Sequence, residues 1–329
     1  MDLLQVTDIR KRQGETETVQ GVSFTCQRFQ KIAVAGETGS GKTSLFKIIA
    51  GLVQPDGGEV LLEGKRVEGP AEKLIPGHPR IAYLSQQFEL RNNYRVEEVL
   101  EYANQLSDQE AADLFEVCRI SHLLKRRTDQ VSGGEKQRIA LARLLITHPV
   151  LLLLDEPYSN LDMIHKKILK SVVRDAGEKL GITCLLISHD PLDLLSWADE
   201  IMVIQAGQII QRGSPVNVYR QPVNAYAAAL LGKYNVWKQS GATGQSQLLR
   251  PESFRIVPRE NGGTPATISD IVFMGSYWDI EVMVNREIIT VRSVTGDYRR
   301  GEEVFVEVVL NQDYTDERIT GLVIDSTLP

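Results

Sequence analysis

Cysteine is scarce in this 329-residue sequence, which contains only three, and they are scattered rather than clustered. Cys26, Cys118 and Cys184 form no C-x-x-C pair, and their odd number leaves no complete disulfide pairing. Residues 233–329 contain neither cysteine nor histidine. This pattern favours reduced thiols packed in a protein interior, and it indicates neither a disulfide framework nor a zinc cluster.

Long apolar runs and an excess of positive charge are also absent. The longest unbroken apolar run, residues 225–231, is far shorter than the roughly 20 residues that a membrane-spanning helix needs. Residues 1–4 lack the charged-then-apolar pattern of a signal peptide. The net charge of −6 provides no electrostatic footprint for nucleic acid. We therefore expect a cytoplasmic protein without a nucleic-acid partner, whose role at a membrane would require separate partner chains.

The strongest positive signal is a glycine-rich loop at residues 36–43, which reads Gly-Glu-Thr-Gly-Ser-Gly-Lys-Thr. It follows an apolar run at residues 32–35 and precedes apolar residues at helical spacing. Glycines let successive backbone N–H groups point at one anion, and the start of the helix adds its positive end. Lys42 is placed to reach the β- and γ-phosphates of a nucleotide, and the Thr43 hydroxyl to bind Mg²⁺. A chance match in a turn is the alternative, and the later motifs decide between the two.

The apolar pattern indicates an α/β core. Three apolar runs do not alternate with polar residues, as in strands covered on both faces of a parallel sheet: residues 150–154, 184–187 and 201–204. Helical periodicity lies between these runs, and a further helical stretch spans about residues 88–148. The sequence therefore predicts a strand–helix alternation with a helical insertion.

The two ends of the chain have a different pattern. Residues 3–9 and 22–26 read as strands of an antiparallel piece, and residues 60–62 as an exposed edge strand. Residues 238–247 are rich in Gly, Ser, Thr and Gln and read as a linker. From residue 249 onward apolar residues recur with period two between glycine-containing turns, which predicts a small β-barrel or sandwich. We therefore expect two domains: 1–232 and 233–329.

Two carboxylates follow the apolar run at residues 150–154. Ligands of α/β proteins bind at the carboxyl ends of the strands, which is where Asp155 and Glu156 stand. Asp155 would hold Mg²⁺ through water, and Glu156 would polarise the water that attacks the γ-phosphate. His189 follows the next apolar run along the chain and is placed to reach the same phosphate.

Residues 132–135, Ser-Gly-Gly-Glu, begin another helical segment and form a second anion-binding helix start. One nucleotide does not need two such cradles from a single small domain. We therefore expect Ser132 to contact the γ-phosphate of a nucleotide that is held by a second copy of the chain.

The order of these motifs resembles that of the ATP-binding-cassette (ABC) ATPases over roughly residues 1–232. The corresponding residues are 36–43 (Walker A), Gln86 (Q-loop), 132–135 (signature), 151–156 (Walker B), 159–162 (D-loop) and His189 (H-loop). The resemblance implies a P-loop NTPase fold in which two cassettes close head to tail around two ATP molecules.

Residue roles follow from the resemblance. Asp162 would couple the two sites, and Gln86 would sense Mg²⁺ and the γ-phosphate. ATP and Mg²⁺ are the implied cofactors. The implied catalytic residues are Glu156, His189 and Gln86, and the implied Mg²⁺ ligands are Thr43, Gln86 and Asp155. The implied nucleotide-binding residues are Gly36, Glu37, Thr38, Gly39, Ser40, Gly41, Lys42, Thr43, Ser44, Ser132, Gly133, Gly134 and Asp162.

The C-terminal part resembles the β-rich accessory domain of binding-protein-dependent importers, beginning at Leu249-Arg250-Pro251-Glu252. This implies an ATPase subunit that works as a homodimer with two transmembrane permease subunits and a solute-binding protein. It would lie on the cytoplasmic face of the cell membrane, and the other chains would select the solute. The alternatives are a non-transport ABC ATPase, a ligand-sensing regulatory ATPase and an export cassette.

The sequence departs from the family pattern in two places. An aromatic residue usually stacks on adenine near position 13, whereas residues 11–14 read Lys-Arg-Gln-Gly. Arg12 is the candidate to replace it by stacking its guanidinium on the base. In addition, the stretch between Arg95 and the signature is shorter than usual. This stretch, together with residues 86–94, is where the family contacts its membrane subunit.

Overall fold

The computed structural model describes residues 2–86, 90, 93–159, 161–238, 246–259 and 262–309. The chain divides into two compact units, Met1–Gly232 and Lys233–Pro329. Each unit has its own buried apolar core.

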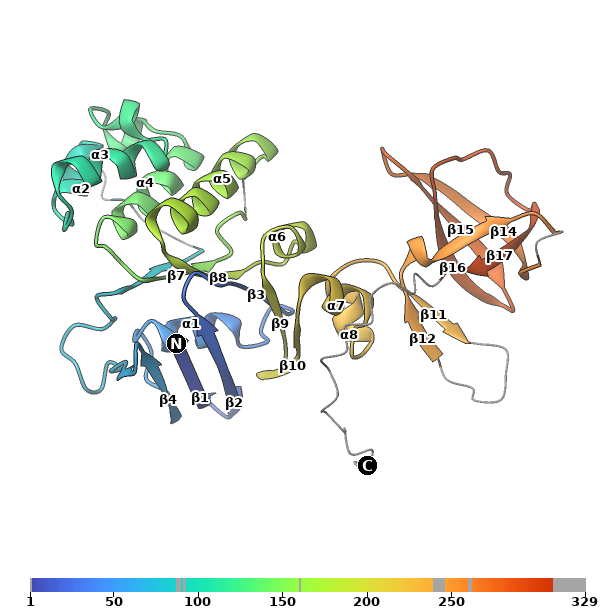
Figure 1. Ribbon diagram of the computed structural model, residues 1–329, viewed down its shortest axis with the longest axis horizontal. Helices are drawn as coiled ribbons and strands as arrows, with labels where there is room; N and C mark the ends of the chain where they lie inside the picture. The colour runs from blue at the N-terminus through green and yellow to red at the C-terminus, as the bar shows by residue number, and fades with distance from the viewer. Residues whose placement is uncertain are drawn as a thin grey trace. The chain divides into compact units, whose positions relative to one another are not determined.

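A six-stranded sheet forms the centre of the first unit, with the strand order β10-β9-β3-β8-β7-β6 (Figure 1). Five neighbouring strands run parallel, and β10 pairs antiparallel with β9. Every residue of β7 and β8 is buried, which confirms that the non-alternating runs are covered on both faces. The strands are β3 (Lys31–Ala35), β6 (Ile81–Leu84), β7 (Leu151–Asp155), β8 (Thr183–Ile187), β9 (Glu200–Gln205) and β10 (Gln208–Gly213).

A second, antiparallel sheet has the order β2-β1-β4-β5. Its strands are β1 (Asp2–Gln13), β2 (Thr16–Gln27), β4 (Gly57–Leu62) and β5 (Lys65–Arg66). Val60 and Leu62 are buried, and β4 lies between β1 and β5. The prediction that residues 60–62 form an exposed edge strand is therefore wrong. Helix α1 (Lys42–Ile49) lies between the two sheets (Figure 1), and its apolar side chains share one core with both.

The helical elements pack on the face of the central sheet that α1 does not cover. A single apolar cluster joins them to β6, β7 and β8 (Figure 1). They are α2 (Val96–Glu101), α3 (Asp108–Val117), α4 (Gly133–Leu145), α5 (Met163–Leu180) and the 3₁₀ turns Ser121–Leu123 and Thr128–Gln130. Parts of the 86–94 segment lie outside the described residues.

Three short helices complete the first unit and pack against β3 and β9. They are α6 (Pro191–Leu195), α7 (Pro215–Arg220) and α8 (Ala225–Leu230). In the described part of the chain, the helices are all too short or too polar to cross a membrane.

Where the second unit is described, its regular structure is all-β apart from the 3₁₀ turn Pro251–Ser253. Its five-stranded antiparallel sheet has the order β13-β17-β14-β15-β16. The strands of this sheet are β13 (Phe254–Val257), β14 (Thr264–Phe273), β15 (Trp278–Val284), β16 (Glu287–Ser293) and β17 (Glu303–Val308), and β11 (Asn235–Lys238) and β12 (Ser246–Leu249) form a separate two-stranded sheet. The predicted period-two faces are confirmed where they are described: Ile280, Val282 and Val284 are buried on β15, and Val304 and Val306 on β17. Trp278 and Val308, predicted on the same faces, are half-buried, and Leu310 lies outside the described residues.

The prediction of an interdomain linker at residues 238–247 is wrong. Lys238 ends β11 and Ser246 begins β12, and these two residues pair in an antiparallel ladder that also joins Asn235 to Leu249. The segment between them therefore connects two strands of the second unit instead of joining two domains. Residues 239–245 lie outside the described part of the chain.

Candidate functional site

The glycine-rich loop joins β3 to α1 and depends on glycine at two close approaches. A Cβ atom at Gly41, whose φ is +98°, would lie 2.0 Å from the carbonyl oxygen of Thr18. A Cβ atom at Gly36 would lie 2.5 Å from the carbonyl oxygen of Ile204. Both approaches are to rigid backbone, so only glycine fits at either position.

The side chain of Lys42 lies inside the loop. Its Nζ donates to the carbonyl oxygens of Gly36 at 2.8 Å and Glu37 at 2.7 Å, and to the Ser40 hydroxyl at 3.2 Å. Burial lowers the pKa of Lys42, while the negative charges of Glu156 and Asp155 oppose that shift. The ammonium group is thus held by neutral acceptors that an anionic ligand could replace.

The predicted carboxylates lie at the end of β7. Asp155 is 4% exposed, and its Oδ2 accepts a hydrogen bond of 2.9 Å from the hydroxyl of Tyr83 in β6. Glu156 has a φ of +50°, a conformation that is unusual for a residue with a side chain and is often found at functional sites. The end of β7 therefore presents one fixed carboxylate and, beside it, one on a strained backbone.

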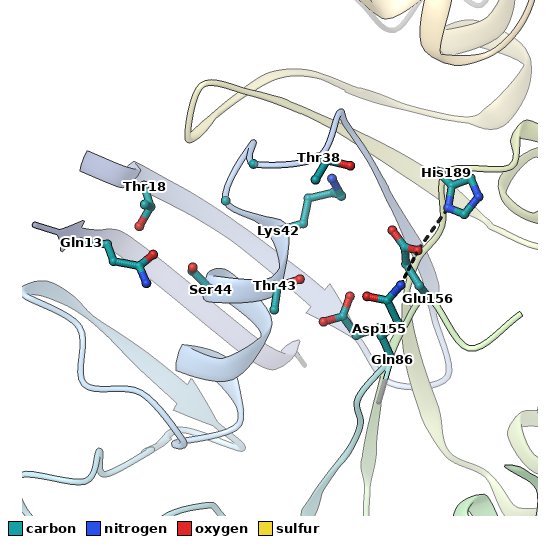
Figure 2. A pocket seen from close by; sticks show the side chains of 12 residues that line it. Gln13, Thr18, Thr38, Lys42, Thr43, Ser44, Gln86, Asp155, Glu156 and His189 are labelled. Carbon is teal, nitrogen blue, oxygen red and sulfur yellow. Dashed lines mark hydrogen bonds and ion pairs between the residues drawn. The ribbon is translucent and has the colours of Figure 1, made fainter. Parts of the chain in front are cut away.

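Glu156 has two polar neighbours from different elements. Nδ1 of His189, which follows β8, lies 3.1 Å from Oε2 of Glu156. The amide Nε2 of Gln86, which follows β6, donates to the same oxygen at 3.5 Å. Figure 2 shows both side chains pointing toward Glu156. Because a carboxylate only accepts, Nδ1 of His189 is the donor in this contact.

These residues line one cavity of about 550 Å³. In Figure 2 the loop crosses its centre, the carboxylates and His189 lie at one end, and Gln13 and Thr18 lie at the other. Apart from two glycines, every described residue that lines it has a polar or charged side chain, and Lys42 is the one cation among them. The lining residues are Gln13, Thr18, Thr38, Gly39, Gly41, Lys42, Thr43, Ser44, Gln86, Asp155, Glu156 and His189.

Arg12, the candidate for stacking on a base, does not line this cavity. Its backbone N–H donates to Oδ2 of Asp56 at 2.7 Å, and Lys11 forms an ion pair with the same carboxylate. Gln13, one residue further along β1, lies on the cavity wall instead. The strand therefore presents an amide, not a guanidinium, to the cavity.

The second expected anion site lies elsewhere. Ser132 caps α4: its Oγ accepts from the Glu135 N–H at 3.3 Å, and the Glu135 carboxylate accepts from the Ser132 N–H at 2.7 Å. None of Ser132, Gly133 and Gly134 is among the described residues that line the loop cavity. Within one chain the fold thus brings the loop, Gln86, Asp155, Glu156 and His189 together, and keeps the 132–134 segment apart.

Asp162 caps α5 and also lies outside the cavity wall. Its Oδ1 accepts from the N–H groups of Ile164 and His165 at 2.9 Å, and its Oδ2 lies 2.6 Å from Nδ1 of His165. These bonds hold the pKa of Asp162 below its usual range. His165 in turn packs against Gly134, where a Cβ atom would lie 2.4 Å from its Cδ2. Asp162 and the start of α4 are therefore linked through one imidazole.

Sequence reasoning missed Tyr83, Thr18 and the pairing of His165 with Asp162. Tyr83 is a polar residue inside the apolar strand β6, three residues before Gln86, and that placement was the available signal. Thr18 and His165 stand in ordinary strand and helix patterns, which carry no signal of their own.

Fold and site together define a P-loop NTPase of the ATP-binding-cassette class. The ABC transporter family matches residues 19–159, and the TOBE domain family matches residues 248–309. A crystal structure of the ADP conformation of an ATP-binding cassette of an ABC transporter is similar, with a TM-score of 0.58 and 27% identity. That likeness covers 66% of this chain and 94% of the cassette.

Relatives of similar length extend the match over both units. A sulfate/thiosulfate import ATP-binding protein of Synechococcus elongatus is 30% identical, covering 86% of each chain. An Fe(3+) ions import ATP-binding protein of Rhodococcus jostii is 30% identical over 86% of this chain and 88% of its own. A spermidine/putrescine import ATP-binding protein of Clostridium acetobutylicum is 27% identical over 93% and 94%.

This chain belongs to the family of ATP-binding subunits of ABC importers. It is an ATPase that binds and hydrolyses ATP to energise the import of a solute. The expected fold class, an ABC cassette followed by a small all-β domain, is confirmed.

Proposed function

We propose that the loop cavity is the ATP site and that two copies of this chain complete two such sites by closing head to tail. The observation that carries the proposal is the convergence of Lys42, Thr43, Asp155, Glu156 and His189 on one cavity. These are a cation, a hydroxyl, two carboxylates and an imidazole, the groups that phosphoryl transfer from a nucleotide requires.

Nucleotide binding uses the loop amides and Lys42. The N–H groups at the start of α1 face the phosphates, and Lys42 exchanges its carbonyl partners, Gly36 and Glu37, for the β- and γ-phosphate oxygens. A charge-assisted contact is about twice as strong as one between neutral groups, so the exchange favours the bound state.

The residues present fit Mg²⁺. Thr43, Asp155 and Gln86 offer hard oxygen donors, and Asp155 is the single carboxylate that Tyr83 orients. Mg²⁺ typically keeps several waters and binds through one or two carboxylates plus substrate phosphates. In the described residues no cluster of three or more His, Cys, Asp or Glu could hold a metal by itself, which fits a site shared with the nucleotide. When bound, Mg²⁺ neutralises charge on the phosphates.

Hydrolysis is assigned to Glu156 as general base. Its carboxylate takes a proton from the attacking water as the water oxygen bonds to the γ-phosphorus and the bond to the β–γ bridging oxygen breaks. His189 and Gln86 both contact Oε2 of Glu156 and so fix its orientation. His189 also borders a smaller cavity that Gly36, Thr38 and Glu156 line with it.

The second copy supplies the 132–134 segment. Ser132, Gly133 and Gly134 begin α4 away from the cavity of their own chain, so they are available to cover the nucleotide of another. Asp162, which is linked to Gly134 through His165, would couple the two nucleotide sites. Because this closure needs the γ-phosphate, ATP would favour the closed dimer and ADP the open one.

We assign Met1–Gly232 as the ATPase domain and Lys233–Pro329 as the accessory domain. Closure and opening of the dimer would change the conformation of two transmembrane permease subunits. A solute-binding protein would deliver the solute to them from outside the cell. This places the chain on the cytoplasmic face of the cell membrane. The import function of its relatives supports this assembly.

A mixing experiment tests the shared site. Lys42→Ala should abolish ATP binding by its own loop, and Ser132→Arg should block closure while its monomer still binds ATP. Neither variant alone should form an ATP-dependent dimer. A one-to-one mixture should, because it contains one site with an intact loop from one copy and an intact 132–134 segment from the other. Size-exclusion chromatography with light scattering in ATP measures this. No dimer in the mixture, or a normal dimer from Ser132→Arg alone, would overturn the proposal.

A further inference from the structure

The hydroxyl of Tyr226, in α8, lies between the phosphate-binding loop and β9. It accepts a hydrogen bond from the Glu37 N–H at 2.9 Å and donates one to the carbonyl oxygen of Ile204 at 3.0 Å. Burial raises the pKa of Tyr226, so the phenol stays protonated and keeps its donor role at neutral pH. One hydroxyl therefore joins residues that are 189 and 22 positions away in the sequence.

The contact is made to the part of the loop that ATP binding loosens. The carbonyl oxygen of Glu37 accepts from Lys42 Nζ at 2.7 Å and from the Ser40 N–H at 3.2 Å. When Lys42 turns to phosphate oxygens, Glu37 loses the first of these bonds. The Tyr226 hydroxyl holds the N–H side of the same residue and does not depend on Lys42.

Gly36, the neighbour of Glu37, shows how closely this end of the loop approaches the backbone of β9. A Cβ atom at Gly36 would lie 2.5 Å from the carbonyl oxygen of Ile204, the same oxygen that accepts from Tyr226. Tyr226 therefore fastens the loop to β9 at the point where the two backbones are in contact.

The tyrosine is itself held in place. Ala227 and Ala228, the next two residues of α8, are fully buried, and Ala227 belongs to an apolar cluster with Ala33, Val203 and other side chains. The Asn224 side chain caps the helix by accepting from the Ala227 N–H at 2.9 Å. A helix anchored in this way can position a hydroxyl at its first turn.

The same helix leads out of the first unit. Helix α8 ends at Leu230, and Gly232 is the last residue of that unit. Gly232 has a φ of +135°, which residues with a side chain rarely adopt. Gly232 is thus two residues from the end of the helix that carries Tyr226, so a change in its backbone angles acts directly on that helix.

We infer that Tyr226 is a positioning residue for the phosphate-binding loop, and that it transmits changes at Gly232 to the affinity for ATP. The inference rests on the proposed assignment of the loop cavity as the ATP site. It adds a route by which the segment leading into residues 233–329 regulates that site. Tyr226 touches no reacting atom and is not a catalytic residue.

The first test removes the hydroxyl alone, with Tyr226→Phe in the full-length chain. We expect the Kd and KM for ATP to rise roughly two- to tenfold, which is the effect of one net hydrogen bond, with kcat changed less than twofold. Hydrogen exchange at the Glu37 amide should become faster. Tyr219→Phe is the matched control, because Tyr219 packs on the same apolar cluster from α7. Unchanged KM and unchanged exchange at Glu37, or a fall in kcat alone, would overturn the positioning role.

The second test addresses transmission. Gly232→Ala forces the joint out of its present backbone conformation, and we expect it to shift the KM for ATP in the native background. The shift should disappear when Tyr226 is phenylalanine. Equal shifts in both backgrounds, or none in either, would overturn transmission through the hydroxyl. Lys42→Ala separates this from the parent proposal: if that variant still binds ATP, the assignment of the site fails whatever Tyr226 does.

Discussion

The hydroxyl of Tyr83 donates a hydrogen bond of 2.9 Å to Oδ2 of Asp155, across two neighbouring parallel strands. Asp155 is almost fully buried, and a buried carboxylate needs such partners to keep one orientation. Burial and the neighbouring Asp155 raise the pKa of Tyr83, so the donor proton is retained. The bond occupies one carboxylate oxygen and leaves the other for the loop cavity, where the proposed Mg²⁺ site lies.

Tyr83→Phe should therefore raise the Mg²⁺ concentration required for half-maximal turnover by about tenfold, at the lower end of what loss of an outer partner of a metal ligand costs. ATP binding without Mg²⁺ should be unchanged. Titration of Mg²⁺ against ATPase rate, and of Mn²⁺ by its own paramagnetic signal, measures both. Tyr158→Phe is the matched control, because the Tyr158 hydroxyl has no hydrogen-bond partner among the described residues. Equal Mg²⁺ requirements in the two variants would show that the Tyr83 bond has no role in metal binding.

Glu156→Gln should lower the rate of hydrolysis by roughly two to four orders of magnitude, the usual contribution of a positioned general base. The amide keeps the shape of the side chain, so ATP binding should persist and a closed dimer should accumulate. Steady-state turnover and light scattering in ATP provide the two measurements. Turnover equal to that of the native chain would remove Glu156 from its assigned role.

Asp190 should give the first unit an acid-labile contribution to its stability. Burial raises the pKa of Asp190, but the ion pair with Lys166 and the Leu192 amide outweigh it, and the net pKa is lowered. A lowered folded pKa stabilises the fold above the unfolded pKa of about 4, and this stabilisation is lost as pH falls through the folded pKa. Asp190→Asn should therefore lower the free energy of unfolding at pH 7 and flatten its decline below pH 4. Urea unfolding at several pH values measures this, and parallel curves for both proteins would contradict it.

The core strands and the phosphate-binding loop could be predicted because their signals are local. Residues 150–154 and 184–187 are apolar at every position, and strands buried on both faces need that pattern. The loop at residues 36–43 has glycines where its backbone meets other backbone, as at Gly36 and Gly41. In such segments the local residues are sufficient to define the structure.

The pairings between distant residues could not be predicted in this way. Tyr83 meets Asp155 and Tyr226 meets Glu37 only because the fold brings separate elements together, and neither pair has a spacing signal in the sequence. The error at residues 238–247 has the same origin. Their composition is typical of a linker, but the ladder from Asn235–Leu249 to Lys238–Ser246 is defined by cross-strand pairing. Composition does not reveal such a pairing.

Gln13 gives the last prediction, because it stands on the cavity wall at the end away from Glu156 and His189. Among the described residues that line the cavity, none is Phe, Tyr or Trp. A stacked aromatic ring contributes about 1–3 kcal/mol per base. Gln13→Tyr should therefore tighten ATP binding by roughly tenfold or more. Gln13→Leu is the matched control, because it removes the amide without adding a ring. Equilibrium titration with ATP measures both, and equal Kd values for the tyrosine and leucine variants would show that no base lies against residue 13.

Arg12→Ala should leave the Kd for ATP unchanged, because Arg12 does not line the cavity and its backbone N–H bonds to Asp56.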